Sequence, residues 1–391
     1  MNPAEIQKPF IAIACGGTGG HLFPGLAVAE QLRQRGCDVA LLISPKVVDQ
    51  AAVKSVRGMD IFTLPAVGLQ NRNYFSFGRS FLKSLFAARK IFRQHRPDAV
   101  LAMGGFTSAP PIFAARKFGA KTFLHESNTV PGRANRLLAC FVDGAFVGFP
   151  EAATKLRARK TSVTGTPVRP QFILRKAEEC RAMLGLDLNR RTLLVVGGSQ
   201  GASGLNELIL SALPLLGQKN WQWLHLTGAK DLEKVKAAYA AQGISAVVKP
   251  FLAEMDLALG AATAAVSRAG ASSLAEMAAM RLPSLLVPLP TAADNHQFVN
   301  AAAFVKTGAA GLLEQKKTSP EDVAASLTEL VENENLRAKM QAALAQWHAP
   351  NAAEQIAENI LSCISRGADQ KSFSPAPPVV ERNATHLKAV A

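Results

Sequence analysis

The chain is poor in cysteine, in long apolar runs and in paired carboxylates, and each shortage excludes a class of protein. Its five cysteines are widely scattered, with no CxxC pair and no histidine at a zinc-binding spacing. We therefore expect no disulfide framework and no zinc site, but a reduced, cytoplasmic setting. No apolar stretch is long enough to cross a bilayer. No Asp-x-Asp pair is present to hold a magnesium ion against a diphosphate, which predicts a protein without a metal cofactor.

Acidic residues are also missing from one long segment, between Asp60 and Asp98. The net charge of the chain is +15, and most of it lies in the first half. Residues 1–166 hold 22 Lys and Arg against 9 Asp and Glu, whereas residues 167–391 hold 22 against 20. The first half is therefore expected to meet an anionic partner.

The acid-free segment, at about residues 72–96, interleaves basic side chains with aromatic and aliphatic ones. A helix from about Phe77 to Gln94 would bring Phe81, Leu85 and Phe86 together beside basic residues, a pattern typical of helices on anionic membrane surfaces. The alternative is a helix whose apolar stripe packs on its own sheet while its charges face water. No nucleic acid is expected, because no recognised nucleic-acid motif accompanies the basic residues.

Glycines crowd the first turn, Cys15-Gly-Gly-Thr-Gly-Gly-His-Leu-Phe-Pro-Gly25, between an apolar run and an amphipathic segment. A strand that stops at glycines and continues as a helix offers bare N–H groups to an anion, so the turn predicts a phosphate site. A dinucleotide cofactor is disfavoured, because Leu22 stands where GxGxxG needs glycine and no acidic residue ends the next strand, Val39–Ile43. A nucleotide-hydrolysing P-loop is disfavoured too, because Gly20-His21-Leu22 replaces Gly-Lys-Ser/Thr.

Short buried-strand patterns alternate with helical patterns in both halves, which predicts an α/β fold of two doubly wound parallel sheets. The expected strands are Phe10–Ala14, Val39–Ile43, Ala99–Ala102, Thr122–Leu124, Gly144–Val147, Thr192–Val196, Gln222–Thr227, Ala246–Val248, Ala264–Val266 and Ser284–Val287.

A seam near Gly165-Thr-Pro167 divides the chain into expected domains of residues 1–166 and 167–366, followed by a disordered tail over 367–391 that is rich in Pro, Ser and charge. A second glycine turn, within Leu193–Ala202, opens the second half as the first turn opens the first. Both turns are expected at the carboxyl ends of their sheets, where ligands bind.

Six motifs occur in the order and spacing of the MurG family of glycosyltransferases, and the similarity spans about residues 8 to 362. They are Gly16-Gly-Thr-Gly-Gly-His-Leu-Phe-Pro-Gly25, Met103-Gly-Gly-Phe106, His125-Glu-Ser-Asn128, Gly165-Thr-Pro-Val-Arg169, Gly197-Gly-Ser-Gln-Gly-Ala202 and Arg268-Ala-Gly-Ala-Ser-Ser-Leu-Ala-Glu276. The resemblance implies the GT-B fold, with two Rossmann-like domains facing across a cleft. It also implies a peripheral membrane enzyme of peptidoglycan synthesis.

The resemblance implies that the second domain binds the uridine diphosphate sugar. The donor residues it implies are Asn128, Arg169, Ser199, Leu252, Ala271, Ser272, Ser273, Leu274, Ala275, Glu276 and Gln297. Taken alone, Ser273-x-x-Glu276 is also a capping box, and Asp294-x-x-Gln297 is also an N-cap pair. Leu252 alone would be a core residue, and Arg169 alone a solvated surface charge.

In the first domain, the resemblance places Thr18, Gly19 and Gly20 on a phosphate-facing turn beside the acceptor diphosphate and the donor sugar. Gly104 and Gly105 form a second wall of the acceptor site. The general base is His21, at the helix start and with a near-neutral reference pKa, or Glu126.

The expected reaction moves GlcNAc from UDP-GlcNAc, with inversion and without metal, to the C4 hydroxyl of the muramoyl pentapeptide on polyprenyl diphosphate. This step converts lipid I to lipid II at the cytoplasmic face of the bacterial cell membrane. The alternatives are a related GT-B transferase for another lipid, such as diacylglycerol, and a UDP-sugar epimerase or sensor. The chain departs from the family pattern at Ser127, at Ala269 and in the spacing of residues 294–297.

Overall fold

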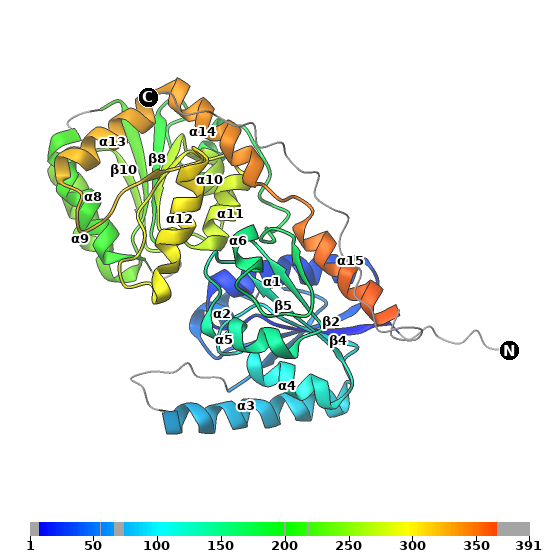
Figure 1. The fold of residues 1–391 in the computed structure, drawn as a ribbon. Helices are drawn as coiled ribbons and strands as arrows, with labels where there is room; N and C mark the ends of the chain where they lie inside the picture. Colours follow the sequence, from blue (N-terminus) through cyan, green and yellow to red (C-terminus); the bar gives the residue numbers. More distant parts are fainter. Residues whose placement is uncertain (1–7, 55, 66–73, 199–200, 217–218, 366–391) are drawn as a thin grey trace.

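Two parallel sheets, each covered by helices on both faces, form two domains in the computed structural model (Figure 1). The structure describes residues 8–365 except 55, 66–73, 199–200 and 217–218. The expected tail, 367–391, therefore lies outside the described residues.

The first domain holds a seven-stranded sheet of order β3-β2-β1-β4-β5-β6-β7, in which every pairing is parallel. Strand order reverses between β1 and β4, and this switch point is where open α/β sheets bind ligands. The strands are β1 (Phe10–Ala14), β2 (Asp38–Ile43), β3 (Asp60–Thr63), β4 (Ala99–Ala102), β5 (Lys121–Glu126), β6 (Gly144–Val147) and β7 (Thr161–Val163). The helices that follow along the chain are α1 (Gly19–Gln34), α2 (Val47–Ala52), α3 (Tyr74–Gln94), α4 (Ala109–Lys117), α5 (Arg133–Leu138), η1 (Ala139–Phe141) and α6 (Pro150–Ala153).

The second domain repeats this winding in a six-stranded parallel sheet of order β10-β9-β8-β11-β12-β13, with its switch point between β8 and β11. Its strands are β8 (Arg191–Val196), β9 (Trp221–Leu226), β10 (Ala246–Lys249), β11 (Ala264–Ser267), β12 (Ser284–Leu286) and β13 (Gly311–Leu312). Its helices are α7 (Ala177–Leu184), α8 (Ser203–Leu216), η2 (Ala229–Asp231), α9 (Leu232–Ala241), α10 (Met255–Ala261), α11 (Ala271–Ala279), η3 (Ala293–Asn295), α12 (His296–Lys306), α13 (Pro320–Glu332) and α14 (Glu334–Trp347).

All ten expected strands are present, with ends shifted by two residues at most. The sequence prediction missed β3, β7 and β13, which lie at or next to sheet edges. These strands are two to four residues long and lack a continuous buried run, as in β3, where three of four residues are exposed. Short edge strands carry little of the apolar pattern on which such predictions depend.

The last helix of the described chain, α15 (Ala352–Ser365), returns to the first domain (Figure 1). Its apolar face, including Ile356 and Ile360, is buried in the core that α1 forms with the first sheet. Arg35 at the end of α1 holds the helix through an ion pair with Glu354 at 2.7 Å. The expected second domain, 167–366, therefore ends in a helix whose packing partners lie in the first domain.

The chain thus crosses between the domains twice, and the two crossings touch. Gly165 has a φ of +82°, and a Cβ at this position would lie 2.3 Å from the Cβ of Ala349. Beside them Phe149 of the first domain packs against Phe304 and Trp347 of the second, with ring centroids 6.2 and 5.4 Å away. A side chain at position 165 is excluded both by its backbone conformation and by this contact.

Helix α3 runs along the side of the first domain that faces away from the second (Figure 1). The predicted grouping of Phe81, Leu85 and Phe86 on one exposed face is wrong. Leu85 is buried in the core and Phe81 packs edge-on against Phe113 of α4, whereas Phe86 is 62% exposed. One face of the helix packs on the domain, as the alternative interpretation expects, and the other meets solvent.

The exposed face of α3 carries three large apolar side chains, Phe75, Leu82 and Phe86, at 85, 52 and 62% exposure. Their spacing of seven and four residues places them on one stripe of the helix. We call this set the α3 stripe; exposed basic residues lie along it at Arg79, Lys83, Lys90 and Arg93. Among the described residues, no helix combines the length and the apolar content needed to span a bilayer.

Candidate functional site

Four turns follow the strands at the switch points of the two sheets: those after β1 and β4 in the first domain, and those after β8 and β11 in the second, of which the turn after β8 includes residues 199–200, outside the described residues. Helices α1 and α11 begin at two of these turns and touch each other across the domain boundary. The hydroxyl of Ser272, in the first turn of α11, donates a hydrogen bond of 2.9 Å to the carbonyl oxygen of Gly20, in the first turn of α1. Two helix N-termini, each favourable to an anion, therefore converge on one point.

His21 lies in the first turn of α1 with its ring flat against the backbone of the turn after β4. A Cβ added at Gly104 or Gly105 would come within 3.1 or 3.0 Å of this ring, and both glycines have positive φ, +106° and +75°. Their lack of a side chain is what lets the imidazole occupy this place. The Thr18 hydroxyl lies 3.3 Å from Nδ1 of the ring. Burial lowers the pKa of His21 below its usual 6.5 against the opposing effect of Glu126, so the ring is neutral at pH 7.

Glu126 ends β5 as a 2% exposed carboxylate whose two oxygens are both fully used. Oε1 accepts from the backbone N–H of Asn128 at 2.8 Å and from its side-chain amide at 3.0 Å. Oε2 accepts from the N–H of Gly132 at 2.8 Å and from the amide of Asn135 at 2.9 Å. An ionised carboxylate offers about four acceptor positions, so Glu126 organises the loop after β5 and has no free lone pair for a substrate proton.

Asn300 of α12 joins this loop to the second domain, a residue that sequence reasoning missed. Its side chain is fully buried and makes four hydrogen bonds. Its oxygen accepts from the N–H and the hydroxyl of Thr129, both at 2.9 Å, and its amide donates to the Asn128 side-chain oxygen at 3.1 Å and to the carbonyl of Ala269 at 3.2 Å. Asn300 lies 171 residues from Thr129 and 31 from Ala269 in sequence, so no local pattern signals these contacts.

Glu276 and Arg169 face each other where the resemblance places the donor. Their charged atoms are 3.7 Å apart, and the Arg169 guanidinium stacks over Phe23 of α1 at 4.1 Å. Burial raises the pKa of Glu276 to about 7, and Arg169 opposes this rise. The capping-box alternative for Glu276 is wrong, because the N-cap of α11 is Gly270 and no side chain caps that helix. The surface-charge alternative for Arg169 is wrong too, because its side chain is only 15% exposed.

The N-cap alternative for Asp294 also fails, because no side chain caps α12. Asp294 instead reaches across the cleft to two arginines of α5, Arg136 at 2.7 Å and Arg133 at 3.3 Å. It holds this position with a φ of +50°, followed by Asn295 at +53°, conformations that Asp and Asn tolerate better than most residues. Gln297 accepts the backbone N–H of Leu289 at 2.9 Å, which orients its amide.

Of the other residues implied by resemblance, three point their side chains away from any ligand. Leu252, Ala271 and Leu274 are buried in the core of the second domain, so only their backbone could contact a donor. Ser273 and Ala275 are half-buried on α11. Ser199 lies outside the described residues. In the part of the chain that the structure describes, no three His, Cys, Asp or Glu side chains gather as metal ligands would.

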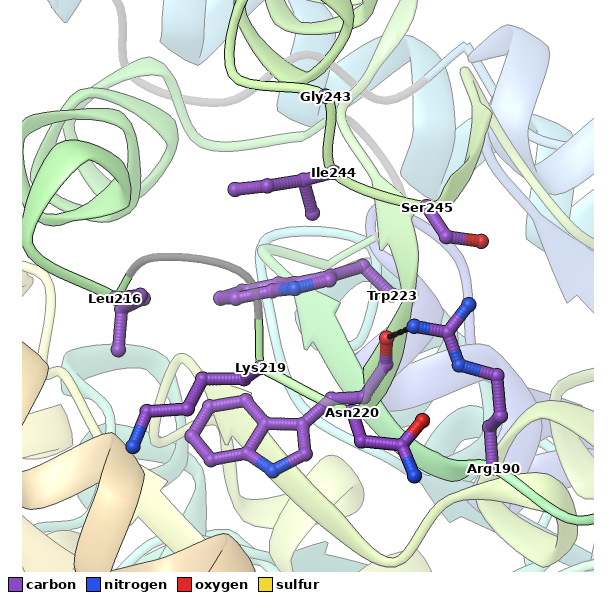
Figure 2. Close-up of a pocket in the computed structure, with 9 residues that line it drawn as sticks. Arg190, Leu216, Lys219, Asn220, Trp223, Gly243, Ile244 and Ser245 are labelled. Carbon is purple, nitrogen blue, oxygen red and sulfur yellow. Dashed lines mark hydrogen bonds between the residues drawn. The ribbon is translucent and has the colours of Figure 1, made fainter.

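A separate hollow of about 330 Å³ lies in the second domain beside the starts of β9 and β10 (Figure 2). Figure 2 shows the indole of Trp223 between Ile244 and Lys219, and the Arg190 guanidinium bonded to the carbonyl of Trp221. Because parallel strands begin at the edge opposite the glycine turns, this hollow is remote from the convergent helix N-termini. We assign it no part in the reaction.

Comparison with known families agrees with this architecture. The model of the glycosyltransferase family 28 N-terminal domain matches residues 11–147, and that of the family 28 C-terminal domain matches residues 192–357. Two curated relatives carry the name UDP-N-acetylglucosamine--N-acetylmuramyl-(pentapeptide) pyrophosphoryl-undecaprenol N-acetylglucosamine transferase. The one from Anaeromyxobacter sp. (strain Fw109-5) is 35% identical and the alignment covers 94% of this chain and 98% of the relative. The relative from Citrifermentans bemidjiense is 37% identical, and the alignment covers 88% of this chain and 97% of the relative.

Solved structures give the same result. MurG from Acinetobacter baumannii superimposes with a TM-score of 0.71 at 29% identity, covering 91% of this chain and 100% of that one. A UDP-N-acetylglucosamine 2-epimerase superimposes with a TM-score of 0.68 at 14% identity. The superposition covers 95% of this chain and 100% of the epimerase chain. At that identity the epimerase shares the fold alone.

Proposed function

The chain belongs to the MurG family of N-acetylglucosaminyltransferases, and from this membership we propose how its residues carry out the reaction. The enzyme transfers GlcNAc from UDP-GlcNAc to the muramoyl pentapeptide of lipid I and so forms lipid II of peptidoglycan synthesis. The observation that carries this conclusion is 35% identity over 94% of the chain to a transferase with that name.

We propose His21 as the general base. The muramoyl C4 hydroxyl attacks C1 of GlcNAc, the bond from C1 to the UDP oxygen breaks with inversion, and the hydroxyl proton passes to the imidazole. The half-buried, neutral ring of His21 supports this role, and the four hydrogen bonds that occupy Glu126 disfavour that residue as the base. Glu126 acts instead as a positioning residue that holds Asn128 toward the donor.

We propose that the first domain binds the acceptor and the second binds the donor. The N–H groups of Thr18, Gly19 and Gly20 would face the acceptor diphosphate, because they open α1 at the cleft. The start of α11 and the glycine turn after β8, with Ser199, would face the donor diphosphate. Glu276 would release Arg169 to accept the ribose hydroxyls, and Gln297 would contact the sugar.

We propose that the α3 stripe, within about residues 72–96, rests on the anionic membrane surface at the cytoplasmic face. Exposed apolar side chains flanked by lysine and arginine are the features of interfacial helices, and each basic residue near an anionic surface contributes about 1 kcal/mol. The described part of this segment contains no acidic residue to oppose the attraction. Residues 72 and 73 lie outside the described residues.

Replacing Phe75, Leu82 and Phe86 together with serine is expected to release the protein from vesicles that contain phosphatidylglycerol. Three exposed apolar side chains contribute little to folding but much of the apolar area available for insertion. Vesicle sedimentation measures the effect, and the thermal midpoint is expected to stay unchanged. A triple variant of exposed residues in the second domain, Leu174, Met183 and Leu215 to serine, is the matched control. Undiminished sedimentation of the α3 variant would remove the membrane assignment.

The reaction itself is tested by transfer of labelled GlcNAc from UDP-GlcNAc to a short-chain lipid I analogue in detergent. We expect product on the muramoyl lipid, none on diacylglycerol, and no change of the sugar when the acceptor is left out. Product on diacylglycerol would favour another lipid transferase, and a changed sugar without acceptor would favour an epimerase. Donor binding without any product would favour a sensor.

A further inference from the structure

The first glycine turn is held from both sides by residues of the segment that follows β2. The carboxylate of Asp49 is buried. Its Oδ2 atom accepts hydrogen bonds from the N–H of Gly17 at 2.6 Å and from the hydroxyl of Ser44 at 2.5 Å. The ammonium of Lys46 donates to the carbonyl oxygen of Gly17 at 2.9 Å. Both backbone groups of Gly17, whose φ is +114°, are therefore fixed by side chains of opposite charge.

This arrangement has a consequence for an anion in the turn. The N–H of Gly17 is already bound to Asp49 and cannot serve a phosphate. The carboxylate of Asp49 beside it would repel a diphosphate, because both groups carry negative charge, and its Oδ1 has no hydrogen-bond partner among the described residues. The helix N-terminus alone supplies only about half an elementary charge against the charge of a diphosphate. A cationic side chain at this place would therefore favour binding of the diphosphate.

Lys46 is the cation that the structure supplies there. Its Nζ lies 5.3 Å from the ring centroid of Phe106, in the turn after β4, and the same ring lies beside Gly17. Within the described residues Lys46 forms no ion pair, so a neutral carbonyl is its only polar side-chain partner there. Its charge is also among the causes that lower the pKa of His21, after burial, so Lys46 lies close enough to His21 to interact with it electrostatically.

We propose that Lys46 binds the diphosphate of the polyprenyl acceptor, an inference that rests on the proposed function. An ammonium has three donors, so Lys46 keeps its bond to Gly17 and directs a second N–H to a diphosphate oxygen. Asp49 is a positioning residue in this arrangement, because it fixes the glycine turn to which Lys46 is hydrogen-bonded. In this way the acceptor site obtains positive charge without a metal ion.

Lys46→Met tests the proposal, because it keeps the length and apolar stem of the side chain and removes the charge. The KM for a short-chain lipid I analogue is expected to rise about 10–100-fold, which is the loss of affinity expected when one charge-assisted hydrogen bond is removed. The KM for UDP-GlcNAc is expected to stay within twofold, and Lys46→Arg is expected to recover most of the acceptor affinity. Lys54→Met, at an exposed lysine just beyond α2, is the matched control and is expected to behave as wild type.

Binding of the same analogue, measured without donor, separates this proposal from the proposed function. Wild-type binding that weakens in Lys46→Met supports the diphosphate contact even where no transfer occurs. An unchanged acceptor KM and Kd would overturn the proposal. Equal losses for donor and acceptor would overturn it too, because they would show that Lys46 only braces the glycine turn.

Discussion

Replacing His21 with alanine is expected to lower kcat for lipid I glycosylation about 10²–10⁴-fold, the usual contribution of a positioned general base. The imidazole lies against Gly104 and Gly105 at the point where α1 and α11 converge, so its loss removes the proton acceptor and leaves the two helix N-termini in place. KM values for both substrates are expected to change little. Steady-state kinetics with a short-chain acceptor measures the effect, with His21→Gln as a variant of similar size.

The pH dependence gives an independent check on the same residue. The base must be neutral, and burial lowers the pKa of His21 below 6.5. Activity is therefore expected to be level near pH 7 and to fall only at a pH below that at which an ordinary imidazole gains its proton. This acidic limb should vanish from the residual activity of His21→Ala. A His21→Ala enzyme with near wild-type kcat, or with the acidic limb intact, would assign the proton transfer to another group.

Replacing Glu126 with alanine is expected to damage the fold and the reaction together. Four donors, from Asn128, Gly132 and Asn135, would lose their acceptor, and each buried unsatisfied donor costs about 1–3 kcal/mol before water or a local shift recovers part of it. We expect the free energy of unfolding to fall by about 3 kcal/mol or more, measured by urea denaturation. The KM for UDP-GlcNAc should rise as well, because Asn128 loses the anchor that holds it beside the second domain.

Glu126→Gln distinguishes this positioning role from a role as the base. The glutamine amide would set its N–H groups against those of Gly132 and Asn135, so stability is expected to fall here too, while residual activity keeps the acidic limb of His21. Wild-type stability combined with complete loss of activity would instead identify Glu126 as the base. Glu151→Gln, at an exposed residue of the same domain, removes the same negative charge and is the matched control.

The sequence was sufficient to predict the central strands because each is a run of mainly buried, apolar residues that is followed by a glycine within three residues. It was insufficient for the edge strands, which lack a continuous buried run, and for deciding which face of α3 packs on the domain and which meets solvent. Periodicity showed that α3 is amphipathic, but Phe81 faces inward because α4 lies beneath it. That neighbour is a product of the tertiary fold.

Prediction of the site had a similar limit. Glycine turns and helix starts are local signals, and they predicted that His21 stands at the start of a helix, as it does in α1. The groups that position them, Asn300 and Asp49, make their contacts across 171 and 32 residues of chain. Even the local pattern Ser273-x-x-Glu276 was ambiguous until Gly270 was found at the N-cap. Long-range partners of this kind follow from topology and packing, which one sequence does not reveal.

The return of α15 to the first domain determines how the cleft can open. Two chain segments, meeting at Gly165 and Ala349, join the domains side by side, so swinging the domains apart about the line through these segments changes few backbone dihedral angles. Twisting one domain against the other would shear the two segments and the packing of Phe149 against Trp347. We expect one dominant mode of motion, in which Ser272 leaves Gly20 and Asp294 leaves Arg136 in the same movement. Substrate entry would then be limited by breaking these contacts together.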